Sequence, residues 1–203
     1  EQHQMKAMIN MGIHFALRGN SEHAYTTMAQ LQEEKFEDSH PLAGRDLLRL
    51  TGLTDKSHKI KSTTPITRNT KNALRIPVDV NDINSPGGCI VRLKRKAAPG
   101  QVRLYTYPLT ATQKRTYQRQ GFPNVETQPN KPIGVNKIGK MMKEGCAKVG
   151  LDCTGHGLRA VAITTAANTA GLPEEDRLTF SRHTSISSQR AYQRPSDKAE
   201  MTR

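Results

Sequence analysis

Apolar residues recur at helical spacing near the start of the chain. Residues 4–17 carry methionine and isoleucine side chains three or four positions apart, and Gly19 follows as a stop signal. Residues 22–31 are expected to form a second helix, because Asn20 and a serine just before it can cap one. The pattern therefore predicts Arg18 at the end of a buried helix, in a tight corner between two helices.

The pattern then changes to short apolar pieces separated by Gly, Pro and Asn. Residues 47–50, 59–62 and 75–80 read as strands, and this spacing is typical of a small antiparallel sheet with hairpins. The expected hairpin tip carries Arg68 and Lys71, which could reach a groove of a nucleic acid or could simply be a solvated charged turn.

The rest of the chain is predicted to be mainly helical. Expected helices span residues 85–96, 134–149, 156–170 and 173–181, and a last one from residue 185 holds Tyr192. Residues 101–107 alternate as a strand, and residues 111–133 read as a polar loop or DNA-facing insertion. These elements predict a single α+β domain over residues 1–203, mainly helical with a small antiparallel sheet.

Charge narrows the class of partner. The chain of 203 residues has a formal net charge of +13, and residues 56–148 hold 19 basic against 4 acidic residues. A basic middle segment is the electrostatic signature of a polyanion binder and favours nucleic-acid binding; the alternative is a ribosomal-type or merely soluble basic surface. No apolar run approaches the roughly 18 residues that span a bilayer, and three scattered cysteines favour reduced, intracellular thiols.

Basic side chains on two expected helices are candidates for contacts with DNA phosphates. Their alternative roles are to complement a helix dipole or to solvate a helix face. Together with the hairpin residue Arg68, the predicted DNA-binding residues are Arg92, Lys94, Arg95, Lys96, Lys137 and Lys140.

The last quarter of the chain carries residue types that suit chemistry on a phosphodiester. The sequence His156-Gly-Leu-Arg159 lies on the first turn of an expected helix, where the helix N-terminus favours an anion. His183 can donate to a phosphate oxygen, and the phenol of Tyr192 can attack phosphorus. Tyrosine has a pKa of about 10, so cations or a base must assist it. With no acidic metal-binding cluster in the sequence, we expect a mechanism without metal or other cofactor.

These motifs resemble the catalytic domain of tyrosine recombinases, the phage-integrase-like enzymes, and most closely the crypton-type recombinases of eukaryotic transposable elements. The first-arginine motif matches around Arg18, the central box is His156-Gly-Leu-Arg159, and the C-terminal box runs from Arg182-His183 to Tyr192. The resemblance covers nearly the whole chain. It implies double-stranded DNA as partner, a homo-oligomer (a tetramer) at synapsis, and a location in the nucleus for a eukaryotic protein or in the cytoplasm otherwise.

The resemblance also implies roles for individual residues. Arg18 and Arg159 would hold the scissile phosphate, His183 would add a hydrogen bond, and His156 would assist proton transfer. Tyr192 would form a 3′-phosphotyrosyl bond, and Glu22 would support Arg18. The product would be DNA strand exchange, that is, recombination or integration. Without the resemblance, Arg18 could equally cap carbonyl groups or pair with Glu22 in a structural role.

Several departures from the family pattern bear on the function. The general-acid lysine of the family would be Lys71, but an equally good register places Arg68 there, and arginine is a poor proton donor. Arg182 stands before the second histidine, where the family usually has glycine. The family's N-terminal core-binding domain is not visible. The alternatives are therefore a domesticated, non-catalytic DNA-binding module or a type IB topoisomerase-like nicking-closing enzyme.

Overall fold

A computed structural model describes residues 2–52, 74–148, 150, 152, 154–169, 171–182, 187 and 189 of the chain. The helices in this part are α1 (Gln2–His14), α2 (Gly19–Tyr25), α3 (Pro86–Arg95), α4 (Ala111–Arg119), α5 (Val135–Ala147), α6 (Gly155–Asn168) and α7 (Glu174–Ser181), with a 3-10 turn η1 (Met28–Gln30). The strands are β1 (Leu31–Lys35), β2 (Asp46–Leu50), β3 (Leu74–Pro77), β4 (Thr106–Pro108) and β5 (Thr127–Pro132). The predicted α+β class with a small antiparallel sheet is confirmed.

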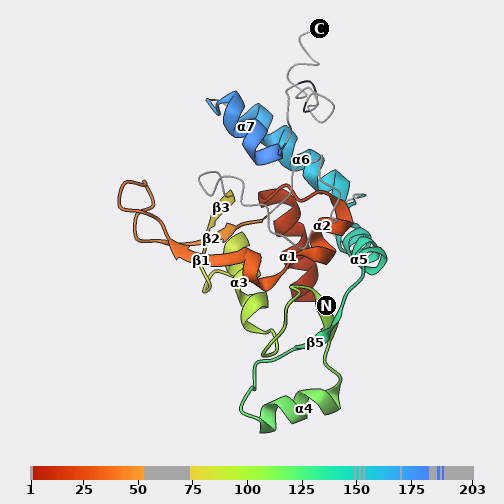
Figure 1. Cartoon of the computed structure of the whole chain (residues 1–203). Helices are drawn as coiled ribbons and strands as arrows, with labels where there is room; N and C mark the ends of the chain where they lie inside the picture. The colour runs from red at the N-terminus through yellow and green to blue at the C-terminus, as the bar shows by residue number, and fades with distance from the viewer. Residues whose placement is uncertain are drawn as a thin grey trace.

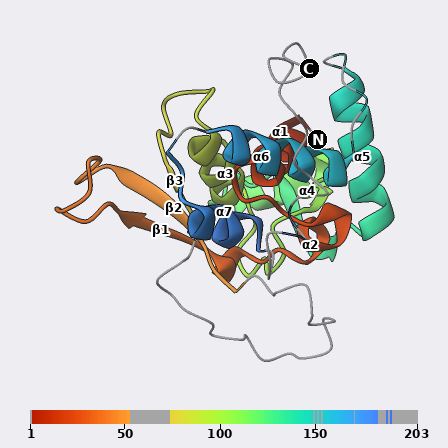
Figure 2. The ribbon, with the colours of Figure 1, turned by 90° about the horizontal axis from the view of Figure 1, so that it is seen from above.

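Helix α1 is the centre of the molecule. It packs against α3, α5 and α6, which surround it in both views (Figure 1, Figure 2). Its inward side chains Ala7, Met8 and Met11 are fully buried. A Cβ at Gly12 would lie 3.1 Å from the side chain of Leu158 on α6, so glycine lets the two helices approach closely. Of the apolar residues that predicted this helix, Met8 is fully buried, and Ile9 and Ile13 are half-buried against the core.

The main sheet is antiparallel with strand order β1-β2-β3. Leu31 pairs with Leu50 between β1 and β2, and Leu48 pairs with Ile76 between β2 and β3. Strands β2 and β3 confirm two of the predicted strands. The third predicted strand, at residues 59–62, and the hairpin tip with Arg68 and Lys71 lie outside the described residues.

Two local predictions near the N-terminus are wrong in their limits. The first helix ends at His14 rather than at residue 17, because Ala16 adopts a left-handed backbone conformation with φ 46°. The second helix ends at Tyr25, and the segment predicted as its second half is the turn η1 and the start of β1. Strand pairing with β2 outweighs the local helical preference there.

The predicted polar loop at residues 111–133 is in part regular structure. Helix α4 begins with a capping box, in which Thr110 and Gln113 bond each other's backbone N–H groups, and β5 pairs with β4. The strand predicted at residues 101–107 is shorter and lies at Thr106–Pro108. Helix α4 lies at the opposite end of the molecule from α6 and α7 (Figure 1), so this excursion extends away from those helices.

Candidate functional site

The corner between α1 and α2 presents Arg18 at the start of α2. Residues Phe15 to Leu17 are fully buried, and Arg18 is the N-cap residue of α2 with an extended backbone. The backbone N–H of Arg18 donates to Glu22 Oε2 at 2.5 Å, one turn into the helix. Arg18 thus lies at a helix start, four residues beyond the end of α1, and not at the end of the first helix as predicted.

Arg159 reaches the same corner from α6. It is 2 % exposed, and its two terminal nitrogens donate to the carbonyl oxygens of Ala16 and Ser181. Ala16 belongs to the α1–α2 corner and Ser181 is the last residue of α7, so one guanidinium joins three parts of the chain. The predicted proximity of Arg18 and Arg159 is present in the fold, although 140 residues separate them in sequence.

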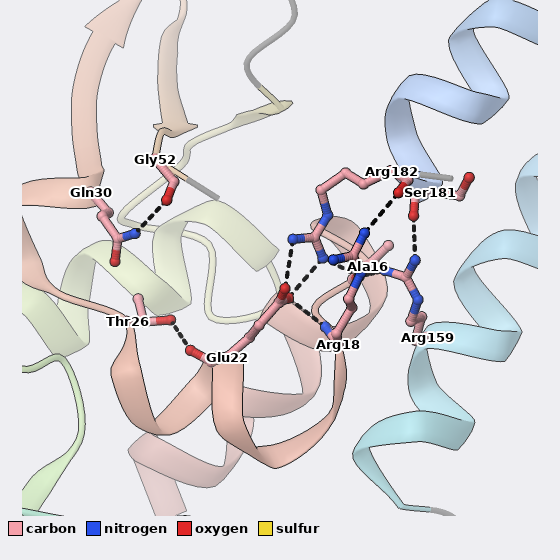
Figure 3. Close-up of polar contacts among 9 residues, drawn as sticks. All are labelled: Ala16, Arg18, Glu22, Thr26, Gln30, Gly52, Arg159, Ser181 and Arg182. Carbon is pink, nitrogen blue, oxygen red and sulfur yellow. Dashed lines mark hydrogen bonds and ion pairs between the residues drawn. The ribbon is translucent and has the colours of Figure 1, made fainter. Parts of the chain in front are cut away.

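Arg182, immediately after α7, completes the arrangement (Figure 3). Its guanidinium binds both carboxylate oxygens of Glu22, at 2.8 Å and 2.7 Å, and also donates to Ala16 O at 2.9 Å. Its own carbonyl oxygen accepts from Arg18 Nη2 at 2.7 Å. We call Arg18, Glu22, Arg159 and Arg182 the arginine cluster.

The arginine cluster is buried at Arg159 and half-buried at its other three residues, and it holds more basic than acidic side chains. Its side chains are three guanidinium groups and one carboxylate, a formal charge of +2 among these four residues, and Arg182 is the one whose guanidinium binds the carboxylate in the contacts described above. The side chains of Arg182 and Glu22 are only 8 % and 11 % exposed. Burial raises the pKa of the Glu22 carboxyl, but the hydrogen bonds and charge of Arg182, with smaller contributions from Arg18, hold the pKa below its usual 4.5. Glu22 is therefore ionised at neutral pH.

Two residues of the arginine cluster region have an uncommon backbone. Among the described residues other than glycine, Ala16 (φ 46°) and Arg182 (φ 53°) have positive φ. Each such residue costs on the order of 1–3 kcal/mol, and persists where its surroundings determine the conformation. Here both carbonyl groups accept hydrogen bonds from arginines. The strained backbone and the arginine contacts occur at the same place.

His156 precedes Arg159 of the arginine cluster by three residues, but its side chain is exposed to solvent. It is exposed on the first turn of α6, while Arg159, three residues later, is buried. Thr154 caps this helix by accepting from Gly157 N at 3.4 Å. The role of His156 in proton transfer stays a prediction.

Four predicted site residues cannot be placed. Lys71, Arg68, His183 and Tyr192 lie outside the described residues. The question of whether Lys71 or Arg68 occupies the position of the general acid therefore stays open, and the roles of His183 and Tyr192 stay predictions.

The four predicted DNA contacts of α3 are engaged within the protein. Arg92 donates to the carbonyl oxygens of Val80, Asp82 and Ile83. The ion pairs of the others are Lys94–Glu33 at 3.0 Å, Arg95–Glu33 at 3.4 Å and Lys96–Glu126 at 2.9 Å. These contacts give the four side chains a part in holding α3, and their contact with DNA stays a prediction.

The two predicted DNA contacts of α5 are less engaged. Lys140 is 70 % exposed and lies 3.8 Å from Glu144 on the same helix, a weak pair, and Lys137 is half-buried. Helix α5 packs beside α2, where a Cβ at Gly139 would lie 2.4 Å from Asn20 Nδ2. The α5 lysines thus lie on a helix that packs against the arginine cluster's own helix α2.

Sequence reasoning missed the roles of Arg182 and His23. Arg182 stood out only as a departure from a family pattern, and nothing local to it indicates a partner 160 residues away. The sequence signal that was present concerns Glu22, the partner of Arg182. Glu22 is the sole acidic residue between positions 2 and 32, and it follows Arg18 by four positions. His23, next to it, is 0 % exposed, and burial lowers its pKa from the usual 6.5 to about 4, against the opposing charge of Glu22.

The sequence matches no family model, and no curated protein is significantly similar to it. Within the described residues, no helix is both long and apolar enough to cross a membrane. In the same part of the chain, no three His, Cys, Asp or Glu side chains are grouped so that they could hold a metal ion.

Proposed function

We propose that this chain cleaves and rejoins DNA strands through a covalent bond to Tyr192, as the tyrosine recombinases that it resembles do. The phenolic oxygen of Tyr192 attacks phosphorus, and the bond from phosphorus to the 5′ oxygen breaks. The phenol loses its proton, the leaving 5′ oxygen gains one, and the 3′ phosphate stays on the tyrosine. Attack by the 5′ hydroxyl of a partner strand reverses these steps and completes strand exchange.

The observation that carries this proposal is the arginine cluster. Arginine suits a phosphodiester because its planar group donates two parallel hydrogen bonds to phosphate oxygens and keeps its charge. A cluster with three guanidinium groups and one carboxylate has net positive charge that an anion can offset. Preorganised cations of this kind stabilise the extra negative charge of a phosphorane-like transition state. Arg18 and Arg159, the two arginines assigned to the phosphate from the sequence, both belong to the arginine cluster.

A second function is favoured by one specific observation. Arg159 is 2 % exposed, and both its terminal nitrogens donate to backbone carbonyls, as a purely structural arginine would. In that case the chain is a DNA-binding module that keeps the arginine cluster for stability and does not cleave DNA. Both functions predict salt-sensitive DNA binding, so only a test of the covalent bond separates them.

The test is capture of the covalent intermediate on nicked suicide duplexes, on which the cleaved end diffuses away and rejoining fails. After denaturation in detergent, the wild-type protein is expected to give a protein–DNA band that Tyr192→Phe abolishes. Tyr107→Phe is the matched control, because Tyr107 packs against the core near β5 with Lys131 over its ring at 5.0 Å.

The outcomes separate the two functions. A band that Tyr192→Phe removes and Tyr107→Phe retains supports strand cleavage. Salt-sensitive binding with no band on any of many duplexes favours the non-catalytic module. A band that persists in Tyr192→Phe contradicts the assignment of the nucleophile.

A further inference from the structure

We infer that Arg182 is a positioning residue, which holds Arg18 and Arg159 in place for the phosphate without binding it. This inference rests on the proposed function and adds a residue to it. It follows from how the backbone and the side chain of Arg182 are used in the arginine cluster (Figure 3).

Arg182 and Arg18 are linked twice, once through the side chain of Arg182 and once through its backbone carbonyl. The side chain of Arg182 binds Glu22, and Glu22 Oε2 accepts from the backbone N–H of Arg18 at 2.5 Å. In return, the backbone carbonyl of Arg182 accepts from the side chain of Arg18 at 2.7 Å. The three residues therefore form a closed ring of hydrogen bonds, in which neither arginine can turn without breaking a bond of the other.

Arg182 is also tied to Arg159 through one shared acceptor. Ala16 O accepts from Arg182 Nη2 at 2.9 Å and from Arg159 Nη1. Arg159 bonds the carbonyl of Ser181, the residue immediately before Arg182. A shift of Arg182 therefore disturbs both acceptors that orient Arg159.

Three of the five N–H groups of Arg182 bond protein oxygens, and its Nε is buried, so little is left for a phosphate. Nη2 donates to both Glu22 Oε2 and Ala16 O, which uses its two hydrogens, and Nη1 donates to Glu22 Oε1. The pair with Glu22 is charge-assisted and bidentate, the strongest form of such a contact. Arg182 thus spends its charge on Glu22, and its contacts orient Arg18 and Arg159.

The left-handed backbone of Arg182 allows its two roles to be tested separately. Arg182→Gly keeps the backbone conformation without strain, and so keeps the carbonyl for Arg18, but removes the pair with Glu22. Arg182→Lys keeps the charge but cannot bind both carboxylate oxygens and Ala16 O together. The matched control is Arg49→Lys, since Arg49 pairs with Glu34 at 3.1 Å on the sheet, away from the arginine cluster.

The experiment measures single-turnover cleavage of a suicide duplex over a range of protein concentrations. In Arg182→Gly and Arg182→Lys we expect the rate at saturation to fall about 10- to 100-fold, as misplaced catalytic groups do, while the half-saturating concentration changes less than about threefold. Glu22→Gln should cause a similar loss, and Glu22→Gln with Arg182→Lys should lose no more than the worse single variant, because both act through one pair. Arg49→Lys should cleave at the wild-type rate.

Two results would overturn the inference while the proposed function stands: saturated rates equal to wild type in both Arg182 variants, or losses that multiply in the double variant. If wild-type protein forms no Tyr192-dependent adduct, the proposed function fails and the role of Arg182 is judged on anion binding instead. Inorganic phosphate should then raise the Tm of the wild type by mass action, and raise that of Arg182→Lys less. Equal rises, or no rise in either protein, would contradict the positioning role.

Discussion

At the residue scale, buried ionisable groups on α2 determine how the fold responds to acid. Glu22 and His23 are neighbours, one ionised in the arginine cluster and the other neutral in the core. His23 is fully buried against Gly12 and Tyr105, and among the described residues neither ring nitrogen has a hydrogen-bond partner. A buried imidazole without a partner resists protonation, because the charge would lose its hydration.

His23 should make the fold less stable as the pH falls below neutral. Unfolded His23 takes up a proton near pH 6.5, but folded His23 does so only near pH 4. Between these pH values the unfolded chain binds more protons than the folded chain. The free energy of unfolding therefore keeps its full value above pH 6.5 and decreases as the pH falls toward 4, by about 3 kcal/mol at most. Urea unfolding at a series of pH values should show this fall in the wild type and a flatter profile in His23→Gln.

The matched control for this profile is His14→Gln. Burial also lowers the pKa of His14, but this side chain is only half-buried at the end of α1. Glu22 affects the free energy of unfolding only at lower pH. Its pKa in the folded protein is held below the usual value, so this contribution to stability is lost only as the pH falls below about 4.5. An unchanged slope between pH 6.5 and pH 4 in His23→Gln would show that His23 is not the group that titrates.

The part of the site that sequence could predict is the part that short motifs encode. Arg18, Glu22 and Arg159 each belong to a local pattern, and the structure brings them together. Arg182 could not be predicted, because its partners Glu22 and Ala16 lie 160 or more residues away and its backbone strain has no sequence signature. Long-range ion pairs are decided by packing and not by local spacing.

At the element scale, the contrast between α5 and α4 shows what an apolar stripe adds to a helix prediction. Helix α5 buries Ile138, Met142 and Cys146 along one side, so its periodicity was visible in the sequence. The side chains of α4 are exposed or half-buried, which leaves no stripe to detect, and only its capping residues Thr110 and Gln113 signal it. Strand β1 was missed because it depends on its partner β2.

The start of α3 supplies an element-scale prediction. Ser85 Oγ accepts from Gly88 N at 3.1 Å and from Asp79 N at 3.0 Å, so the N-cap joins α3 to the segment after β3. A Cβ at Gly88 would lie 1.9 Å from Asp79 O, a backbone atom that cannot move alone. Gly88→Ala should therefore lower the free energy of unfolding by about 1–3 kcal/mol or more, as overpacking does.

Chemical denaturation monitored by circular dichroism measures this effect, and Gly134→Ala is the matched control. Gly134 precedes α5 with open space around its Cβ position, so its replacement should cost less than about 1 kcal/mol, mainly through the poorer N-cap. Equal losses at the two glycines would mean that the contact between α3 and Asp79 gives way easily.

At the scale of the whole molecule, the positive charge is not equally available to a polyanion. The cations of α3 are bound to the carboxylates of Glu33 and Glu126 or to backbone carbonyls. Helix α5 lies at the periphery beside α2 and α6 (Figure 2), where Lys140 is exposed in a weak pair with Glu144 and Lys137 is half-buried. A DNA duplex that reaches the arginine cluster is therefore expected to lie along α5 and not along α3.

This arrangement predicts which lysines set the salt dependence of DNA binding. Each phosphate contact releases counterions and steepens the plot of log affinity against log salt by about 0.9. Lys137→Gln with Lys140→Gln should flatten that slope by about 2, because both lysines are expected to contact phosphates. Lys94→Gln with Lys96→Gln removes the same formal charge, but these lysines already bind Glu33 and Glu126, so the slope should change by less than about 1. Fluorescence anisotropy with a labelled duplex between 50 and 200 mM salt measures both slopes. A larger effect from the α3 pair would place the duplex along α3, and equal effects would indicate binding by diffuse net charge, with no path defined by the fold.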